Sequence, residues 1–366
     1  MDNKLKVFEG HLHFTFKVPV RESVEIFKQE FEETGTDKYC FLSIPSHGAV
    51  GNDILQNSKA LYYKAMFSPN AYAYAGLEYD YSLSEKDMQD DLLRQAKEYL
   101  SNGFDGFKML EGMPKYRKFI NFPLDDARYD KFYAYMEEQG KPIIMHLAHP
   151  RVFWDKEKLD EYWINRGCLY DESFPSFDHL INEAFGILKK FPNINLTLAH
   201  WGFLVHNREL MLKFMSYPNT RLDVTPGGEQ YFEMIDDDIV WWKSFIEKYA
   251  DRICYGTDLY QFEKNGVDNW KTAFHRRPDF VRNFFETDTE HFYGDKKFKG
   301  IKLDQKYLKK IYRDNLLELL GEPSKINYQY LIDRANELLK NATKESLDEY
   351  DLKCIIWDIT DIMQAK

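Results

Sequence analysis

Short apolar runs alternate with segments of helical periodicity along most of the chain. The helical pattern is clearest at 84–100, where Ser84 can act as an N-cap and an apolar stripe recurs every three or four residues. Similar stretches lie at 123–139, 177–191, 208–217 and 239–249. The apolar runs, which we interpret as strands, lie at 5–13, 38–44, 72–79, 104–110, 142–147, 194–200, 220–225 and 252–258. Eight strands, each followed by helical sequence, predict an α/β fold, the (β/α)8 TIM barrel.

An open doubly wound sheet is the alternative to this barrel. Such a sheet usually has a glycine-rich phosphate loop after its first strand, and the chain contains neither a G-x-G-x-x-G nor a Walker A motif. Residues 303–320 form an amphipathic helix, and helical sequence continues beyond Gly321 to Lys366. We therefore predict a barrel at 1–320 and a helical extension at 321–366 that packs on the barrel.

One connection, residues 149–176, is unusually long. It is rich in aromatic and charged residues and has no clean helical stripe. Long ordered loops in compact domains are often functional lids, and the alternative is a surface insertion. Because this loop directly follows the fifth strand, we expect it to cover the mouth of the barrel and to contact a ligand.

The composition limits the partners. The 366 residues carry a net charge of −11, which disfavours binding to nucleic acid and to anionic membranes. Short basic pairs such as Arg276-Arg277 are interpreted as solvated loop charges. No apolar run approaches the roughly 18 residues of a membrane span, the first residues lack a signal-peptide pattern, and the four cysteines form no C-x-x-C motif. We expect a cytoplasmic protein with a small-molecule substrate, and homo-oligomerisation is possible.

Five chemically active side chains lie where strands end. His11 and His13 end the first strand, His146 ends the fifth, His200 the sixth and Asp258 the eighth. The active sites of barrels lie at the carboxyl ends of the strands, so these side chains are expected to converge. Neutral imidazoles and a carboxylate are ligands for Zn²⁺, Mn²⁺ or Fe²⁺. The pattern therefore predicts a metal-dependent enzyme in which a histidine also moves protons.

Four motifs at these positions resemble one known superfamily. The segments "GHLHF", "PIIMHLA", "LTLAHWGF" and "ICYGTD" are similar to the signatures of the amidohydrolase superfamily. More narrowly, they resemble the amidohydrolase-related group (family 2) of TIM-barrel enzymes, which includes aminocarboxymuconate-semialdehyde decarboxylase. The resemblance spans about residues 5–320, and it specifies the superfamily better than the substrate.

The resemblance implies roles for the strand-end residues. His11, His13 and His146 would bind one divalent metal, most simply Zn²⁺, with Mn²⁺ or Fe²⁺ as alternatives. Asp258 would be the fourth ligand or the base toward the bound water, and His200 would transfer a proton or polarise the substrate. The group commonly has Asp two residues before its first histidine, where this chain has Glu9. The longer acid could alter how the ligands are oriented, or could itself reach the metal.

Several further residues are candidates for substrate contacts. Lys108 ends the fourth strand, where binuclear members of the superfamily carry a carboxylated lysine between two metals. We favour one metal, in which case Lys108 could contact an anionic substrate group. Arg151 and Trp154 in the long loop are further candidates. Six polar residues at other strand ends are less specific, namely Ser43, His47, Glu78, Asp80, Asp223 and Thr225.

The leading hypothesis is a metal-dependent hydrolase that acts on an amide, lactone or related C–N or C–O bond. A non-oxidative decarboxylase is the first alternative, and it needs a carboxylate-bearing substrate. A catalytically silent binding barrel is the second alternative, and the complete set of histidines and aspartate argues against it.

Overall fold

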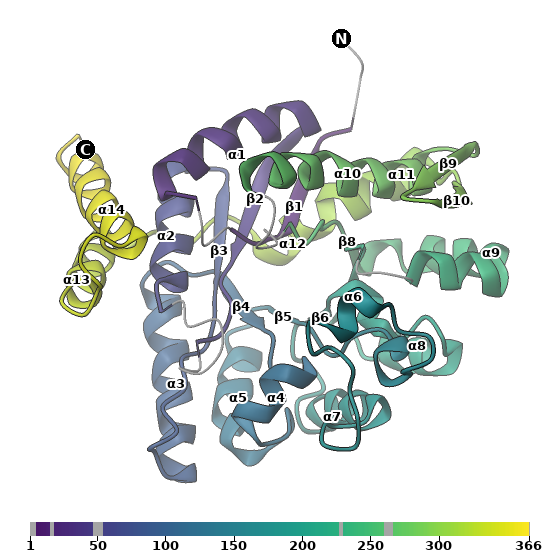
Figure 1. Ribbon diagram of the computed structural model, residues 1–366, viewed down its shortest axis with the longest axis horizontal. Helices are drawn as coiled ribbons and strands as arrows, with labels where there is room; N and C mark the ends of the chain where they lie inside the picture. The colour runs from purple at the N-terminus through teal and green to yellow at the C-terminus, as the bar shows by residue number, and fades with distance from the viewer. Residues whose placement is uncertain (1–4, 15–17, 47–53, 227–229, 260–265, 366) are drawn as a thin grey trace.

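The computed structural model describes residues 5–14, 18–46, 54–226, 230–259 and 266–365, with the backbone alone for 266–274. Eight parallel strands follow one another in chain order around a barrel (Figure 1). The first strand lies beside the segment that follows the last one: the Gly10 N–H donates to the Tyr255 carbonyl (3.2 Å), and the Asp258 N–H donates to the His11 carbonyl (2.8 Å). The strands are β1 (Val7–Leu12), β2 (Thr36–Leu42), β3 (Ala71–Ala75), β4 (Gly106–Met109), β5 (Ile143–Met145), β6 (Leu196–Leu198), β7 (Thr220–Asp223) and β8 (Ile253–Cys254). The predicted (β/α)8 barrel is confirmed.

Helices surround this barrel on the outside (Figure 1). They are α1 (Val20–Thr34), α2 (Gln56–Met66), α3 (Glu85–Ser101), α4 (Pro114–Ile120), α5 (Asp130–Glu138), α6 (Glu161–Ile164), α7 (Phe177–Lys190), α8 (Arg208–Met215), α9 (Gln230–Lys248), α10 (Gly266–Glu286), α11 (Gln305–Lys309), α12 (Asn315–Leu320), α13 (Tyr328–Leu339) and α14 (Leu347–Gln364). An antiparallel hairpin of β9 (Glu290–Tyr293) and β10 (Lys296–Lys299) follows α10.

Local sequence explains where several helices begin. The Ser84 side chain accepts a hydrogen bond from the Asp87 N–H, so α3 starts at the predicted N-cap. Ser176 caps α7 in the same way. One predicted boundary is wrong: α5 begins only at Asp130, because residues 127–129 form a 3-10 turn after the Asp126 cap. Helix α9 has a kink at Asp238, so the helix predicted from 239 corresponds to the part after the kink, and residues 230–237 add a helical part before it.

Two apolar layers hold the barrel together. One fills the barrel interior near Leu316 and includes Phe8, Tyr72 and Ile144. The other lies mainly between the strands and the surrounding helices. All four cysteines are buried and free, and Cys40 and Cys254 belong to the interior layer. They pack there as small apolar side chains.

The C-terminal helices α13 and α14 lie on one side of the barrel, at the left of Figure 1, against α1 and α2. Asp358 of α14 accepts hydrogen bonds from Arg21 (2.6 Å) and from the Tyr62 hydroxyl (2.8 Å). Asp351 is fully buried, faces the Lys59 ammonium at 3.2 Å and accepts the Val20 N–H (2.9 Å). The helical extension therefore packs on the barrel, while the domain boundary at residue 320 remains a prediction.

We expect Asp351→Ala to lower the free energy of unfolding by about 3–5 kcal/mol, because removing one side of a buried ion pair leaves the other charge uncompensated. Urea unfolding followed by circular dichroism measures this loss. Asp361→Ala is the control, since Asp361 is exposed on the same helix. An Asp351→Ala variant as stable as Asp361→Ala would contradict the structural role assigned to this carboxylate.

The long loop contains a 3-10 turn (Arg151–Trp154) and the short helix α6. Phe153, Leu159, Cys168 and Tyr170 form a small apolar cluster of their own. Lys115 of α4, which follows β4, donates a hydrogen bond to the carbonyl of Arg166 in the loop (2.5 Å). The loop therefore packs against α4, while its coverage of the barrel mouth and its contact with ligand remain predictions.

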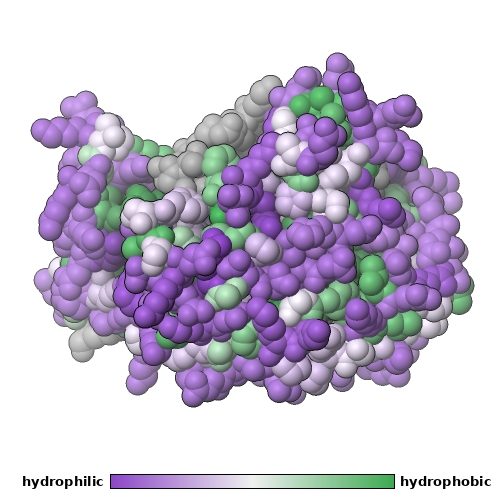
Figure 2. All heavy atoms as spheres, turned by 90° about the horizontal axis from the view of Figure 1, so that it is seen from below, coloured by the Kyte–Doolittle hydropathy of each residue, from purple (hydrophilic) through white to green (hydrophobic). Residues whose placement is uncertain are grey.

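The surface seen in Figure 2 is mostly hydrophilic, and its hydrophobic residues lie in small separate groups. This pattern agrees with a sequence in which 30% of the residues are charged. Along the described part of the chain, no helix combines the length and the apolar character that a membrane crossing requires.

Candidate metal centre

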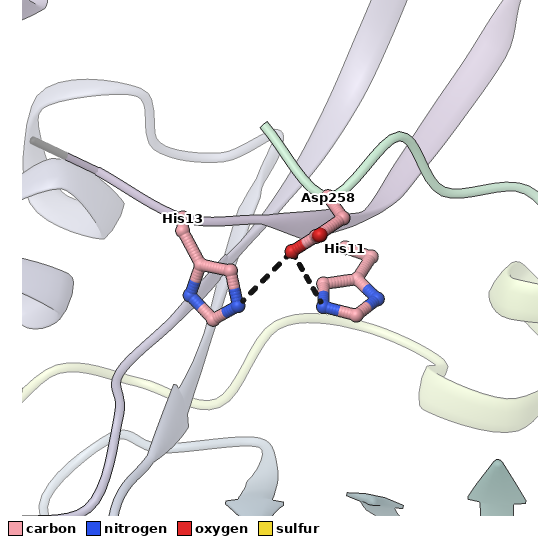
Figure 3. Close-up of side chains that lie close together, drawn as sticks. All are labelled: His11, His13 and Asp258. Atoms are coloured by element: carbon pink, nitrogen blue, oxygen red, sulfur yellow. Dashed lines mark ion pairs between the residues drawn. The ribbon is translucent and has the colours of Figure 1, made fainter. Parts of the chain in front are cut away.

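The exits of β1 and β8 bring three possible metal ligands together. Side-chain donor atoms of His11, His13 and Asp258 all lie within 4.8 Å of one another. The Asp258 Oδ1 atom is 3.4 Å from His11 Nε2 and 3.6 Å from His13 Nε2 (Figure 3). Both histidines are buried, and the Asp258 side chain is about one-fifth exposed (21%). The three side chains therefore form a compact group that solvent reaches from the side of the carboxylate.

Hydrogen bonds on the far side of each ring orient the two imidazoles. His11 Nδ1 lies 2.6 Å from Asp223 Oδ2, and His13 Nδ1 donates to the Leu42 carbonyl (2.9 Å). With Nδ1 protonated, the lone pair of each ring is on Nε2, the atom that faces Asp258. A carboxylate or carbonyl behind the ring is the usual way in which proteins orient a metal-binding histidine.

His200 approaches the same carboxylate from β6. Its Nε2 is 3.8 Å from Asp258 Oδ2, and its backbone N–H donates to Asp223 Oδ1 (2.7 Å). The residues from His200 to Phe203 all have positive φ, between 55° and 64°, and Asp258 has φ 50°. Left-handed backbone is uncommon for residues other than glycine, and several such residues close together are typical of a functional site. At both strand exits it accompanies a side chain directed into the centre.

His146 lies against His200 and outside the compact group of three. Their ring centroids are 4.9 Å apart. His146 Nε2 and both ring nitrogens of His200 are buried and have no hydrogen-bond partner among the described residues. Two imidazoles with unpartnered nitrogens thus line the same region as His11 and His13.

The chemistry of these donors fits a divalent metal. Burial holds the pKa of His11, His13, His146 and His200 well below the usual value, so the rings are neutral. Neutral imidazole is the form that binds metal. Burial also raises the pKa of Asp258 to about 6, while the nearby cations Arg277 and Lys108 oppose this shift. The unpartnered buried nitrogens give an independent reason for a cation here.

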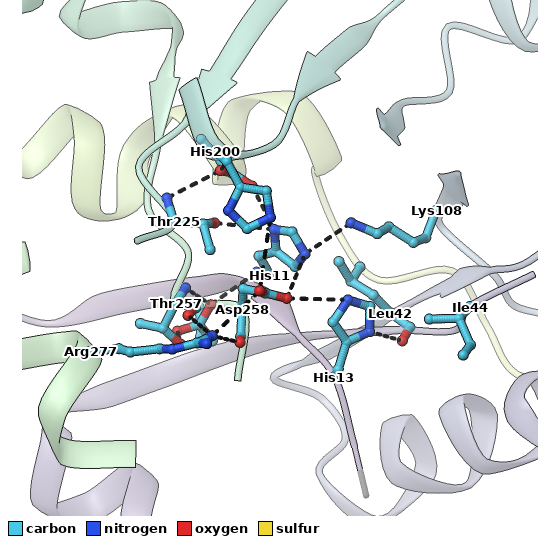
Figure 4. A network of polar contacts seen from close by, with 12 residues as sticks. His11, His13, Leu42, Ile44, Lys108, His200, Thr225, Thr257, Asp258 and Arg277 are labelled. Carbon is cyan, nitrogen blue, oxygen red and sulfur yellow. Dashed lines mark hydrogen bonds and ion pairs between the residues drawn. The ribbon is translucent and has the colours of Figure 1, made fainter. Parts of the chain in front are cut away.

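Lys108 is fully buried, and its Nζ lies 2.9 Å from His11 Nε2 (Figure 4). Burial lowers its pKa to about 8, and the nearest acids, beginning with Asp258, oppose this shift. Lys108 therefore contacts the candidate centre directly, as expected for the end of β4. Its contact with substrate remains a prediction, and a carboxylated bridge between two metals remains the alternative.

Glu9 is directed toward β8 and is absent from the compact donor group. Its Oε1 accepts the backbone N–H groups of His11 (2.9 Å) and Thr257 (3.0 Å), and its Oε2 accepts the Thr257 hydroxyl (2.7 Å). The pairing of β1 with β2 shifts register after Glu9, so strict alternation along this strand does not hold. The acid links the two strands that carry the candidate ligands.

The remaining candidates occupy varied places. Arg151 is exposed, with its guanidinium 5.9 Å from the Phe177 ring, and the Trp154 indole N–H donates to the Pro175 carbonyl (3.1 Å). These contacts pack the long loop, and substrate contacts of both residues remain predictions. Of the six less specific residues, Asp223 and Thr225 belong to the centre, since both contact His11 Nδ1. Glu78 forms an ion pair with Arg334 of α13, and Asp80 accepts a hydrogen bond from the Ser82 N–H. Ser43 is buried, and His47 lies outside the described residues.

One residue of the centre is not expected from its sequence context. Arg277 of α10 donates through Nη1 to the carbonyls of Thr257 (3.0 Å) and Asp258, and Nη1 is 3.4 Å from Asp258 Oδ2. Its side chain is only 15% exposed. The interpretation of Arg277 as a solvated loop charge is therefore wrong, whereas Arg276 is exposed. The two arginines are adjacent in a helix, but Arg277 faces the centre and Arg276 faces solvent. Two adjacent basic residues in a sequence do not by themselves indicate this difference.

Comparison with known proteins agrees with the fold. The model of a family described as amidohydrolase matches residues 83–321. A TIM-barrel protein from Bordetella bronchiseptica, described as uncharacterized, is 14% identical over 87% of this chain and 99% of its own, with a TM-score of 0.55. A putative amidohydrolase from Staphylococcus aureus is also 14% identical, over 87% of this chain and 100% of its own, with a TM-score of 0.52. These two likenesses show the fold alone.

A search of curated proteins finds no match to the chain. The family match, in contrast, covers more than half of the residues and includes the exits of β4 to β8, where Lys108, His146, His200 and Asp258 lie. This protein belongs to the amidohydrolase family, and it is an enzyme of the metal-dependent amidohydrolase superfamily.

Proposed function

We propose that this protein is a hydrolase that uses one divalent metal held by His11, His13, His146 and Asp258. The observation that carries the proposal is the convergence of His11 Nε2 and His13 Nε2 on one oxygen of Asp258. His146 completes the set through its buried Nε2. Zn²⁺ is the expected ion because it favours imidazole and carboxylate ligands, with Mn²⁺ or Fe²⁺ as alternatives.

The bound metal would lower the pKa of a coordinated water and polarise a carbonyl oxygen of the substrate. The protein's own residues must then accept and return the proton. His200 suits this task because its ring is buried and near Asp258 Oδ2, and because its backbone is fixed by Asp223. Asp258 can pass the proton onward through the same oxygen. The substrate would be a small molecule with an amide, lactone or related C–N or C–O bond.

Decarboxylation is the alternative reaction, and it requires a cation that is free to hold a substrate carboxylate. Arg277 Nη1 is already bound to two backbone carbonyls, so Lys108, whose Nζ lies 2.9 Å from His11 Nε2, is the cation that a decarboxylase would use. A test uses metal-loaded enzyme, chelated enzyme and a panel of lactones, amides and aromatic carboxylates. Metal-dependent ring opening or amide cleavage supports the proposal. Metal-dependent release of carbon dioxide, with no hydrolysis, would replace it by the decarboxylase.

Cytoplasmic location, the absence of nucleic-acid and membrane partners, and homo-oligomerisation remain predictions of the sequence. Measuring the mass of the protein in solution tests whether it forms a homo-oligomer. Trp357, which is 61% exposed on α14, is one apolar side chain that an oligomer could cover.

A further inference from the structure

Arg277 reaches the candidate centre from a helix, and the other side chains of the centre come from strand exits. Helix α10 is held against α1 close to this residue, because His275 Nε2 lies 2.8 Å from Glu30 Oε2 and 3.1 Å from Glu33 Oε2. This anchor places the Arg277 guanidinium beside the turn that follows β8. Figure 4 shows it next to Thr257 and Asp258.

The turn at Asp258 is held from two directions. On the β1 side, Glu9 accepts hydrogen bonds from the Thr257 N–H and hydroxyl, and the His11 carbonyl accepts the Asp258 N–H. On the α10 side, Arg277 Nη1 donates to the carbonyls of Thr257 and Asp258. One donor shared by two successive carbonyls requires both peptide groups to face it. This arrangement fits the left-handed backbone at Asp258, with φ 50°.

Arg277 also distinguishes the two oxygens of the Asp258 carboxylate. Oδ2 lies 3.4 Å from Arg277 Nη1 and 3.8 Å from His200 Nε2. Oδ1 is the oxygen nearest to His11 Nε2 and His13 Nε2. One oxygen therefore faces the candidate metal ligands, and the other faces the guanidinium and the candidate proton-transfer histidine.

We propose that Arg277 is a positioning residue that orients Asp258, so that Oδ1 binds the metal and Oδ2 stays available to His200. The inference rests on the metal-dependent function proposed above. A carboxylate held in this way binds through a single oxygen, which leaves room in the coordination sphere for water. Arginine suits this role because its planar, permanently charged fork can hold carbonyl and carboxylate oxygens together.

The test compares wild type with Arg277→Gln, Arg277→Lys and Arg276→Gln. Arg276 is the matched control: it is adjacent in sequence but exposed, with its guanidinium 4.3 Å from the Tyr293 ring. Co²⁺ is the probe metal. Its affinity is measured by competition with a chelator, its coordination geometry by visible absorption, and the fold by thermal unfolding of the metal-free proteins.

We expect Arg277→Gln to weaken Co²⁺ binding about tenfold and to change the absorption spectrum, because residues that orient a ligand typically affect metal affinity by about 10–100-fold. Arg277→Lys should restore part of the affinity, and Arg276→Gln should match wild type. The metal-free variants should unfold like wild type.

An Arg277→Gln variant with wild-type affinity and spectrum would overturn the role of Arg277 while leaving the proposed function intact. A loss of affinity matched by an equal loss of stability in the metal-free protein would reduce Arg277 to a structural residue and would also overturn it. Wild-type protein that binds no Co²⁺ would overturn both this inference and the proposed function.

Discussion

His200→Ala should keep its metal and lose most of its activity, whereas His11→Ala should lose both. His11 belongs to the compact group of three donors, and His200 lies beside it with Nε2 nearest to Asp258 Oδ2. Removing a positioned acid–base group typically lowers the rate by about 10²–10⁴. Metal content by elemental analysis and turnover on a substrate from the panel are measured side by side.

Two controls separate this effect from damage to the fold. His200→Asn retains a residue that tolerates left-handed backbone, so it tests the imidazole without changing the turn. His179→Ala removes an exposed histidine of α7 and should retain both metal and activity. If His200→Ala loses its metal as readily as His11→Ala, then His200 is a ligand, and the assignment of proton transfer to it is wrong.

Asp223→Asn should weaken metal binding by roughly 10–100-fold, as expected when a carboxylate behind a metal-binding histidine is lost. Asp223 is buried, and its two oxygens serve His11 Nδ1 and the backbone N–H of His200. An amide has one oxygen and cannot accept from both sides. If the NH₂ group faced the His11 ring, it would favour the tautomer with the proton on Nε2, which cannot bind the metal through that atom. If it faced the His200 N–H, two donors would meet and that hydrogen bond would be lost.

The control for Asp223 is Thr225→Val. The Thr225 hydroxyl lies 3.1 Å from the same His11 Nδ1, farther than the carboxylate oxygen at 2.6 Å. Thr225→Val should therefore bind metal almost as wild type does. Isothermal titration with Zn²⁺ measures both variants. Equal affinities in Asp223→Asn and wild type would show that the carboxylate does not set the orientation of His11.

The barrel could be predicted from the sequence because most strands are, or end in, short apolar runs between polar segments. Buried parallel strands have this pattern, and each predicted run overlaps an observed strand. His11, His13, His146, His200 and Asp258 stood out for a related reason. A polar residue that directly follows an apolar strand must lie at the barrel mouth, where strand exits meet.

The residues that support the centre could not be identified in this way. Asp223 looked like any polar residue after a strand, and its role depends on His11, 212 positions away in the chain. Arg277 lies in a helix that carries no strand-exit signal. The position of Glu9 two residues before His11 does not indicate its hydrogen bonds to Thr257, 248 positions away in the chain. Each role depends on tertiary contacts that no local pattern encodes.

The most direct test of the metal centre is the number of divalent ions bound per chain. The protein is purified without chelators, loaded with Zn²⁺ and then dialysed to remove unbound metal. We expect one ion per chain in wild type and a large loss in Asp258→Ala, because Asp258 Oδ1 lies between the two Nε2 atoms of the centre. Two ions per chain would instead assign Lys108 to a carboxylated bridge between metals. Wild-type protein that retains no metal after dialysis, or an Asp258→Ala variant that retains it fully, would contradict the proposed centre.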